Sequence, residues 1–313
     1  MKQRLRAALW QGAPGSGNVA ANLDVIESRA RSAREQGADI LICPEMMLTG
    51  YNIGSQQIER LAEHSEGASA ERVARIATRF ELAIAYGYPE RDGGDVYNAA
   101  LLIDANGRTL LNYRKAHLFG VEEKASFQAG EILDAVATFN GWTVGLLICY
   151  DVEFPEATRL LTLAGADLVL VPTALMKPYE SLPGVLIPAR AYENQIYLAY
   201  ANYCGTEGDL DYCGNSIIAG PTGTSLWQRI IGEHFETQRG DRGRRGGELH
   251  RVRFLIRARF RRSHGTVVKN FKLRFAVAGD RIDTQDLPPD RLRLDLLLPT
   301  RQRGIEFRSL RIE

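Results

Sequence analysis

Short apolar segments alternate with amphipathic stretches through the first 228 residues of the chain. Several of these segments are apolar on both faces, which is typical of strands that are buried between two layers. The predicted strands span residues 5–10, 39–43, 82–88, 99–103, 144–150, 168–172, 197–202 and 216–219. The predicted helices span residues 18–35, 68–80, 155–163 and 185–194. This order of elements predicts an α/β domain in which helices cover the outer faces of sheets.

The charge of the chain changes sign near residue 228. Residues 229–313 carry 19 Arg and 2 Lys against 11 acidic residues, a net charge of +10, whereas the first 228 residues carry a net charge of −9. Residues 238–247 are rich in Gly and Arg and cannot bury a core, although residues 252–260 and 292–298 are apolar enough to become ordered. We therefore predict a folded domain over residues 1–228 and a divergent Arg-rich tail over residues 229–313.

Cysteine usage and hydropathy predict the compartment. No apolar run approaches the roughly 18 to 20 residues that a membrane-spanning helix needs. Residues 1–6 lead directly into a short apolar stretch without a cleavage site, so we expect no export signal there. The four cysteines, at positions 43, 149, 204 and 213, form no Cys-x-x-Cys pair and no disulfide-dense pattern. These features predict a protein of the reducing cytoplasm.

Three potentially reactive side chains stand at the ends of predicted strands. Glu45 follows the strand at 39–43, Lys115 follows a strand and the turn at 106–107, and Cys149 lies at the end of the strand at 144–150. Because ligands in α/β sheets bind where strand ends meet loops, these three groups can converge. Each one alone has an ordinary structural explanation: a small buried thiol, a solvated lysine and a carboxylate that caps a turn. Their shared position favours a common catalytic role.

A cysteine nucleophile needs a base or a positive environment to become a thiolate. Three of the five histidines lie in the tail, and neither His64 nor His117 stands at a strand end as the other groups do. A glutamate base with a lysine fits the pattern better, because glutamate can take the thiol proton and later return it to a departing amine. The lysine, with a backbone N–H, can stabilise the oxyanion of a tetrahedral intermediate.

Three motifs, in this order along the chain, resemble the three signatures of the carbon–nitrogen hydrolase (nitrilase) superfamily. They are Pro44-Glu45, Arg114-Lys115-x-His117-Leu118 and Ile148-Cys149-Tyr150-Asp151-x-x-Phe154-Pro155-Glu156. Supporting matches are Tyr97-Asn98, Val171-Pro172-Thr173, Arg190-Ala191-x-Glu193-Asn194 and the segment from Ser216 through Pro221-x-Gly223. The resemblance covers residues 1–228 without a large gap, and it implies a four-layer αββα sandwich with a Glu–Lys–Cys triad. In that triad Glu45 is the general base, Lys115 stabilises the oxyanion and Cys149 is the nucleophile.

The same resemblance implies further site residues. The backbone N–H of Tyr150 would complete the oxyanion hole, and Asp151 and Thr173 are the other expected oxyanion or substrate-binding residues. Members of the family often carry a second glutamate shortly after the lysine, which here is Glu122 or Glu123, and we prefer Glu123. The resemblance implies no metal and no cofactor. Because many members associate through packed layers of neighbouring protomers, we also expect a homo-oligomer.

The branch of the superfamily is indicated by residues around the cysteine. Residues 43–54, 86–90 and 201–205 resemble bacterial 5-aminopentanamidases and related aliphatic amidases. True nitrilases usually carry Trp and Glu after the cysteine, where this chain has Tyr150 and Asp151, which favours an amide over a nitrile. N-carbamoylases usually place arginines a few residues later, where this chain has Glu153, Phe154 and Glu156. An acidic or aromatic lining suits a cationic substrate such as an ω-amino amide.

We therefore predict a thiol amidase that hydrolyses a small aliphatic amide, such as 5-aminopentanamide, to a carboxylate and ammonia through a Cys acyl-enzyme. Its expected partners are the amide and water, without membrane or nucleic acid. The tail departs from the family after Trp227, and it is either a nucleic-acid-binding appendage or a segment without selected function. Neither Tyr nor Trp follows Trp227 to stack on bases, which favours the second interpretation. The alternative function is a catalytically compromised hydrolase scaffold whose basic tail mediates binding.

Overall fold

The computed structural model describes residues 4–230, 248–251, 261–263 and 266–268 of the chain. The chain divides into two compact units, Met1–Ile256 and Arg257–Glu313. In the second unit, strand β14 (Arg261–Ser263) pairs antiparallel with β15 (Thr266–Val268). The predicted apolar segments 252–260 and 292–298 lie outside the described residues. Within the described part of the chain, no helix is both long and apolar enough to cross a membrane.

The first sheet has the strand order β13-β1-β2-β3-β4-β5. Its strands are β1 (Ala7–Gln11), β2 (Ile40–Ile42), β3 (Ala83–Asp92), β4 (Asp95–Ile103), β5 (Thr109–Arg114) and β13 (Glu248–Arg251). Strands β1, β2 and β3 are parallel, whereas β4 is antiparallel to both β3 and β5, and β13 is antiparallel to β1. Two antiparallel steps return β5 to the direction of β3, so β2 and β5 end at the same edge of the sheet.

The second sheet has the strand order β10-β11-β9-β8-β7-β6, and β12 also pairs with β11. Its strands are β6 (Val136–Phe139), β7 (Trp142–Leu146), β8 (Leu168–Thr173), β9 (Tyr197–Asn202), β10 (Cys204–Glu207), β11 (Leu210–Ala219) and β12 (Ser225–Ile230). The three central strands β7, β8 and β9 are parallel, and the remaining pairings are antiparallel.

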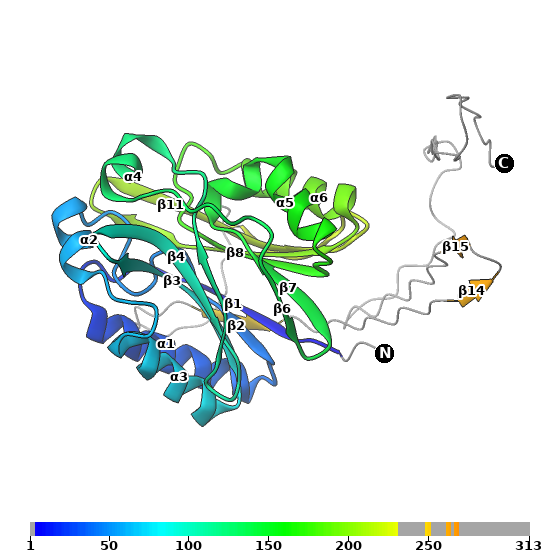
Figure 1. The fold of residues 1–313 in the computed structure, drawn as a ribbon, viewed down its shortest axis with the longest axis horizontal. Helices are drawn as coiled ribbons and strands as arrows, with labels where there is room; N and C mark the ends of the chain where they lie inside the picture. Colours follow the sequence, from blue (N-terminus) through cyan, green and yellow to red (C-terminus); the bar gives the residue numbers. More distant parts are fainter. Residues whose placement is uncertain (1–3, 231–247, 252–260, 264–265, 269–313) are drawn as a thin grey trace, which may run out of the picture. The chain divides into compact units, whose positions relative to one another are not determined.

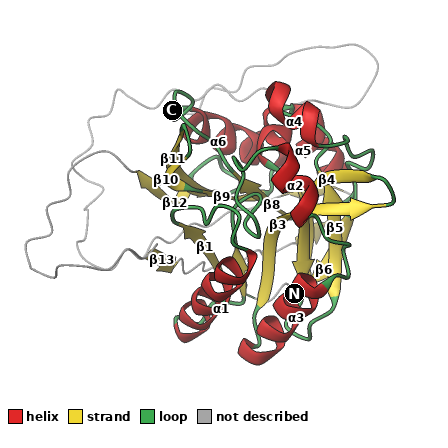
Figure 2. Ribbon diagram, turned by 90° about the vertical axis from the view of Figure 1, so that its left-hand side faces the viewer, coloured by secondary structure: helices red, strands yellow, loops and turns green. Residues whose placement is uncertain are grey.

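Helices cover the outer faces of the two sheets. Helices α1 (Val19–Glu35) and α3 (Ala68–Phe80) lie on the first sheet, and α5 (Pro155–Leu163) and α6 (Leu182–Asn194) lie on the second (Figures 1 and 2). The short helices α2 (Ser55–Leu61) and α4 (Gly120–Ser126) contact each other. Ile26 of α1 and Val73 of α3 pack against Leu41 and Ile84 of the first sheet. Each helix therefore buries one apolar face and leaves the other face polar.

The two sheets pack face to face through a common apolar core. Leu9 and Ile42 of the first sheet belong to the same buried cluster as Val144, Leu170 and Ala199 of the second. Both faces of the central strands are therefore buried, which explains why their sequences are apolar at successive positions. The predicted αββα arrangement of four layers is confirmed.

Most predicted elements are present, with differences of a few residues at their ends. One strand prediction, residues 144–150, is wrong over its last part, because β7 ends at Leu146 and Cys149–Glu153 forms a short 3₁₀ helix, η1. Cys149 has a φ of 46°, a left-handed conformation that differs from the extended backbone of a regular strand. The elements additional to the predicted ones are strands β5, β6, β10, β12, β13, β14 and β15 and helices α2 and α4.

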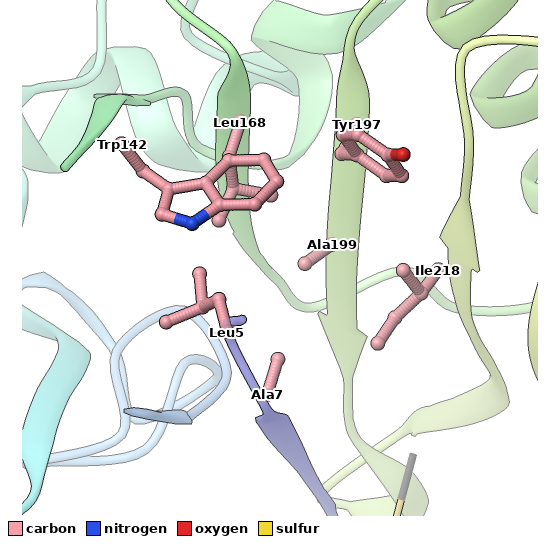
Figure 3. Close-up of a pocket in the computed structure, with 7 residues that line it drawn as sticks. All are labelled: Leu5, Ala7, Trp142, Leu168, Tyr197, Ala199 and Ile218. Atoms are coloured by element: carbon pink, nitrogen blue, oxygen red, sulfur yellow. The ribbon is translucent and has the colours of Figure 1, made fainter. Parts of the chain in front are cut away.

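A small apolar cavity of about 20 Å³ lies at one end of the second sheet's central strands. It is lined by Leu5, Ala7, Trp142, Leu168, Tyr197, Ala199 and Ile218 (Figure 3). Trp142, Leu168 and Tyr197 are the first residues of β7, β8 and β9. Because these strands are parallel, the cavity lies at the opposite end of them from Cys149.

Candidate active site

The ends of three strands bring Glu45, Lys115 and Cys149 together. Glu45 lies just beyond β2, Lys115 directly follows β5, and Cys149 lies just beyond β7 of the facing sheet. Lys115 Nζ donates a hydrogen bond of 2.8 Å to Glu45 Oε1, and neither side chain is exposed. Cys149 is half-buried and interacts electrostatically with both charges. The three residues selected at predicted strand ends thus form one cluster.

Glu123 of α4 is the fourth member of this cluster. Its Oε1 accepts a hydrogen bond of 2.6 Å from Lys115 Nζ and one of 2.7 Å from the hydroxyl of Tyr51. Its Oε2 accepts a hydrogen bond of 2.8 Å from the backbone N–H of Phe119. The neighbouring Glu122 is exposed. Of the two adjacent glutamates, it is therefore Glu123 that contacts the lysine.

Burial and charge set the electrostatics of the cluster. Burial raises the pKa of Glu45, and the charge of Glu123 raises it further, although Lys115 opposes both effects. Burial alone would lower the pKa of Lys115, but the two carboxylates outweigh it, so this pKa is raised and the amine is an ammonium. The site therefore holds a permanent buried positive charge between two carboxylates.

The backbone turns at Cys149, whose thiol interacts electrostatically with Glu45, Lys115 and Glu123. Cys149 is the first residue of η1, and its left-handed φ of 46° turns the chain sharply after the strand. Burial raises the pKa of the thiol, and the charge of Glu45 raises it further, whereas Lys115 and a backbone hydrogen bond from Ala174 lower it. The resting group is therefore a neutral thiol beside a carboxylate.

One oxygen of Glu45 has no partner within the described residues. Its Oε1 accepts hydrogen bonds from Lys115 Nζ and, at 2.7 Å, from Asn98 Nδ2. Its Oε2 is buried and accepts none from the described part of the chain. A buried carboxylate oxygen without a donor is costly, so this oxygen is suited to accept a proton from a reacting group.

Asp151 connects the segment that carries Lys115 to the turn that carries Cys149. Its Oδ1 accepts hydrogen bonds of 2.9 Å from the His117 N–H and 2.8 Å from His117 Nδ1. Its Oδ2 accepts hydrogen bonds of 2.8 Å from the Tyr113 hydroxyl and 3.1 Å from the Ile148 N–H. Tyr113 and His117 flank Lys115 in the sequence. The fully buried carboxylate of Asp151 thus holds these two segments in register.

Tyr150 and Thr173 differ in their surroundings. Tyr150 is half-buried and packs edge to face against Phe119 and Phe154, with ring centroids 5.3 Å and 5.0 Å apart. The Phe154 ring also stacks on His117 at 3.9 Å. Thr173 is fully buried at the end of β8, where its hydroxyl donates to the Val171 carbonyl at 3.1 Å. Aromatic side chains therefore gather on one side of the cysteine turn.

Tyr51 and Tyr113 are site residues that the sequence analysis missed. Tyr51 reaches Glu123 across 72 positions of the chain, and Tyr113 reaches Asp151 across 38. Neither pairing has a periodic or local signal, although Tyr51 lies within the amidase-like segment 43–54. No cluster of three or more His, Cys, Asp or Glu suited to a metal ion occurs among the residues that the structure describes.

Comparisons with known proteins agree with this arrangement. The family model of the carbon–nitrogen hydrolases matches residues 6–231. The hydrolase in the pqqF 5′ region of Pseudomonas protegens is 52% identical over 71% of this chain and 78% of its own length. An (R)-stereoselective amidase of Pseudomonas sp. is 33% identical over 72% of this chain and 80% of its own length.

Solved structures of an amidase from Nesterenkonia sp. have the same fold, with a TM-score of 0.69 and 36% identity over 81% of this chain and 91% of the amidase. Its cysteine-to-alanine mutant has been solved in complex with butyramide. Its glutamate-to-glutamine mutant shows covalent addition of the acetamide moiety of fluoroacetamide at the active site cysteine. The chain therefore belongs to the carbon–nitrogen hydrolase (nitrilase) superfamily and is a hydrolase of the amidase type.

Proposed function

We propose that the protein hydrolyses a small aliphatic amide through an acyl-enzyme on Cys149, with Glu45 and Lys115 as its catalytic partners. The observation that carries this proposal is the buried Oε2 of Glu45, which has no donor among the described residues and belongs to the cluster that holds Lys115 and Cys149. The covalent adduct at the active site cysteine of the Nesterenkonia amidase supports the same role for Cys149.

In the first half of the reaction, Glu45 takes the thiol proton while the sulfur attacks the amide carbon. A C–S bond forms, and the carbonyl electrons move to the oxygen as an oxyanion. The Lys115 ammonium and the backbone N–H of Tyr150 stabilise this oxyanion. The proton on Glu45 then passes to the nitrogen, the C–N bond breaks, and ammonia leaves behind a thioester.

In the second half, Glu45 takes a proton from water, and the resulting hydroxide equivalent attacks the thioester carbon. The C–S bond breaks, the acid is released, and the proton returns to the sulfur. The raised pKa of Glu45 suits both halves, because burial brings the carboxylate closer in basicity to the groups that it deprotonates. Glu123 also holds Lys115, through its hydrogen bond to Nζ.

Asp151 and Thr173 complete the proposed site. The contacts of Asp151 with His117 and Tyr113 support a role in holding the cysteine turn against the lysine segment. A direct contact of Asp151 or Thr173 with the substrate stays a prediction. The isosteric change Asp151→Asn removes one acceptor oxygen from the contacts with His117 and Tyr113. A fall in kcat would then indicate the positioning role, whereas a rise in KM would indicate a direct contact with the substrate.

Glu153 supports a cationic substrate such as 5-aminopentanamide. It is half-buried at the end of η1, and no hydrogen bond to its carboxylate is found within the described residues. Burial raises its pKa, whereas the charges of Lys115 and Arg190 lower it, so the carboxylate lies in the neighbourhood of the site. Glu153 precedes Phe154, whose ring packs against Tyr150. A carboxylate together with aromatic rings is suited to a substrate ammonium group.

The test measures ammonia release from 5-aminopentanamide, from pentanamide, which lacks the amine, and from butyramide. Wild-type protein should hydrolyse 5-aminopentanamide best, and Cys149→Ala should hydrolyse none of the three. Glu153→Gln should raise KM for 5-aminopentanamide about tenfold, with pentanamide unaffected, because it removes one charge-assisted contact. The matched control is Glu156→Gln, three residues further on and exposed.

If the wild-type protein releases no ammonia from any of the three amides, the amidase proposal is rejected and the alternative of a catalytically compromised scaffold is favoured. Equal rates with 5-aminopentanamide and pentanamide, unchanged in Glu153→Gln, would reject the cationic substrate while leaving the amidase mechanism intact.

We also propose that the protein is a cytoplasmic homo-oligomer. Helices α5 and α6 expose Leu163, Val185 and Tyr192 on the outside of the second sheet, where a second copy would cover them. Leu163→Glu should lower the molar mass measured by light scattering, whereas Ile132→Glu, also exposed but in a loop outside these helices, should not. A monomeric wild-type protein would contradict this proposal. A reducing compartment would keep the Cys149 nucleophile as a thiol.

A further inference from the structure

A second buried carboxylate, Glu207, lies outside the proposed mechanism. It is the last residue of β10 and is 3% exposed. Its Oε1 accepts a hydrogen bond of 2.8 Å from Ser16 Oγ. Its Oε2 accepts three more, from the Tyr51 N–H at 3.1 Å, the Asn52 N–H at 2.8 Å and the Tyr212 hydroxyl at 2.7 Å. All of these donors are neutral, so no cation in this set balances the buried charge.

The contact between Glu207 and the segment 49–54 is close. Gly50 has a φ of 88°, and a Cβ at this position would lie 2.3 Å from Glu207 Oε1. The Asn52 side chain adds hydrogen bonds of 3.1 Å to the Glu207 carbonyl and 2.7 Å to Asp209 Oδ1. The segment therefore fits against the end of β10 only with glycine at position 50.

Glu207 fixes the backbone at Tyr51, whose side chain enters the active site. The Tyr51 hydroxyl donates to Glu123 Oε1 at 2.7 Å, the same oxygen that accepts the bond from Lys115 Nζ. Burial raises the pKa of Tyr51, and the charges of Glu123, Glu45 and Cys149 raise it further. The phenol therefore remains a hydrogen-bond donor that interacts with Glu123, Glu45 and Cys149.

A continuous set of hydrogen bonds thus leads from β10 to the buried lysine. Glu207 Oε2 accepts hydrogen bonds from the backbone N–H groups of Tyr51 and Asn52, which fixes the position of the Tyr51 backbone. The Tyr51 hydroxyl determines where Glu123 Oε1 lies, and Glu123 in turn holds Lys115. A displacement of about 1 Å at a catalytic group is enough to cost roughly 100-fold in rate.

We propose that Glu207 is a positioning residue for amide hydrolysis, which acts by fixing Tyr51 and through it Glu123 and Lys115. This inference rests on the proposed amidase function. A purely structural carboxylate would affect the stability of the fold, whereas a positioning carboxylate affects kcat in a way that depends on the Tyr51 hydroxyl.

The test is a double-mutant cycle of Glu207→Gln and Tyr51→Phe in the full chain, with kcat, KM and the unfolding temperature measured for each variant. Glu207→Gln replaces one carboxylate oxygen with an NH2 group that cannot accept, and it removes the negative charge that strengthens the bonds to the Tyr51 and Asn52 N–H groups. We therefore expect kcat to fall about 10- to 100-fold with little change in KM. The double variant should be no slower than Tyr51→Phe alone, because Glu207 acts on Glu123 only through the Tyr51 hydroxyl, which Tyr51→Phe already removes.

Tyr212→Phe is the matched control, since it removes one hydrogen bond to Glu207 and leaves the bonds to the segment 49–54 in place. It should retain wild-type kcat. Asn52→Ala is a second variant that tests the same contact between the segment 49–54 and the end of β10. It removes only side-chain hydrogen bonds, so it is expected to fold even if Glu207→Gln does not. Its kcat should also fall without a change in KM.

Unchanged kcat in both Glu207→Gln and Asn52→Ala would overturn the inference. Strictly additive losses in the double variant would also overturn it, since Glu207 would then act independently of the Tyr51 hydroxyl. These outcomes require an active wild-type protein, so they are distinct from failure of the amidase proposal, in which the wild-type protein itself releases no ammonia.

Discussion

The two ends of the paired sheets contain different kinds of side chain. Beyond the ends of β2, β5 and β7, buried Glu45 and Lys115 lie beside Cys149, and Glu123 joins them from α4. At the beginnings of β7, β8 and β9, by contrast, the space between the sheets is lined by aliphatic and aromatic side chains (Figure 3). The same layers and the same strands thus support one charged end and one apolar end.

This difference separates residues whose burial stabilises the fold from residues whose burial lowers the free energy of unfolding. Burial of an apolar side chain is favourable by about 25 cal/mol per Å², so the apolar end is explained by stability alone. Each buried ion loses several kcal/mol of hydration, which ion pairing repays only with excellent geometry. The charged end therefore indicates chemistry that an apolar packing of the same volume would not perform.

The largest effect is expected from Glu45→Gln. The amide keeps an oxygen for Lys115 and Asn98 but cannot take a proton, so kcat should fall by about 10²- to 10⁴-fold. The raised pKa of Glu45 means that its protonated form favours the folded state, and this stabilisation is lost as the pH rises through that pKa. At neutral pH the variant should therefore unfold at the same or a higher temperature.

Ammonia release by Glu45→Gln within a few-fold of wild type would remove Glu45 from the mechanism. A large fall in its unfolding temperature would contradict the view that the charged end lowers stability.

Lys115→Ala should have the next largest effect on activity. Loss of one oxyanion donor typically costs about 10²- to 10³-fold in kcat. The variant also leaves Glu45 and Glu123 without their shared cation, and breaking a buried pair costs about 3–5 kcal/mol of folding free energy. Lys124→Ala, an exposed lysine of the same helix as Glu123, is the control and should change neither quantity. Equal behaviour of the two variants would exclude the proposed role of Lys115.

Leu168→Ala tests the apolar end. Leu168 is 4% exposed and lines the cavity, so its truncation should destabilise the fold by about 2–5 kcal/mol. The kcat per folded molecule should stay at the wild-type value, because the cavity lies at the far end of the strands from Cys149. Denaturant unfolding and active-site titration measure the two quantities. A fall in kcat without a loss of stability would show that the two ends are not independent.

The smallest effect is expected from removal of the second unit, Arg257–Glu313. Ammonia release should be unchanged, and any binding of nucleic acid by the full chain should be weak and salt-sensitive, because the tail supplies only charge. A cut after Gln228 also removes β13, which pairs with β1, and should lower the unfolding temperature without changing kcat. Selective nucleic-acid binding above about 0.15 M salt, where charges are screened within about 8 Å, would contradict this interpretation.

The sequence predicts the elements whose signal is local and strong. The central strands are apolar on both faces, and α3 and α5 have the expected bounds. The short helices α2 and α4 and the four-residue strand β10 have too little periodicity to be recognised. The strand predicted over residues 144–150 is wrong beyond Leu146, because hydropathy does not reveal the left-handed backbone at Cys149.

The same limit applies to the site. The motifs predict Glu45, Lys115 and Cys149 as site residues, and the preference for Glu123 over Glu122 agrees with the contact that Glu123 makes with Lys115. Tyr51 and Glu207 carry no such signal, since 156 positions separate them along the chain. Contacts of this kind depend on how two sheets and their connecting loops pack, which single-sequence patterns do not contain.

The most direct test of the central claim is rapid-quench mass spectrometry of the full chain mixed with 5-aminopentanamide. We predict a transient mass increase equal to the acyl group, located on the peptide that contains Cys149 and formed at least as fast as ammonia is released. The Cys149→Ala variant should show neither the adduct nor ammonia release. Sustained ammonia release by that variant, or an acyl adduct on Cys43, Cys204 or Cys213 instead, would contradict the account.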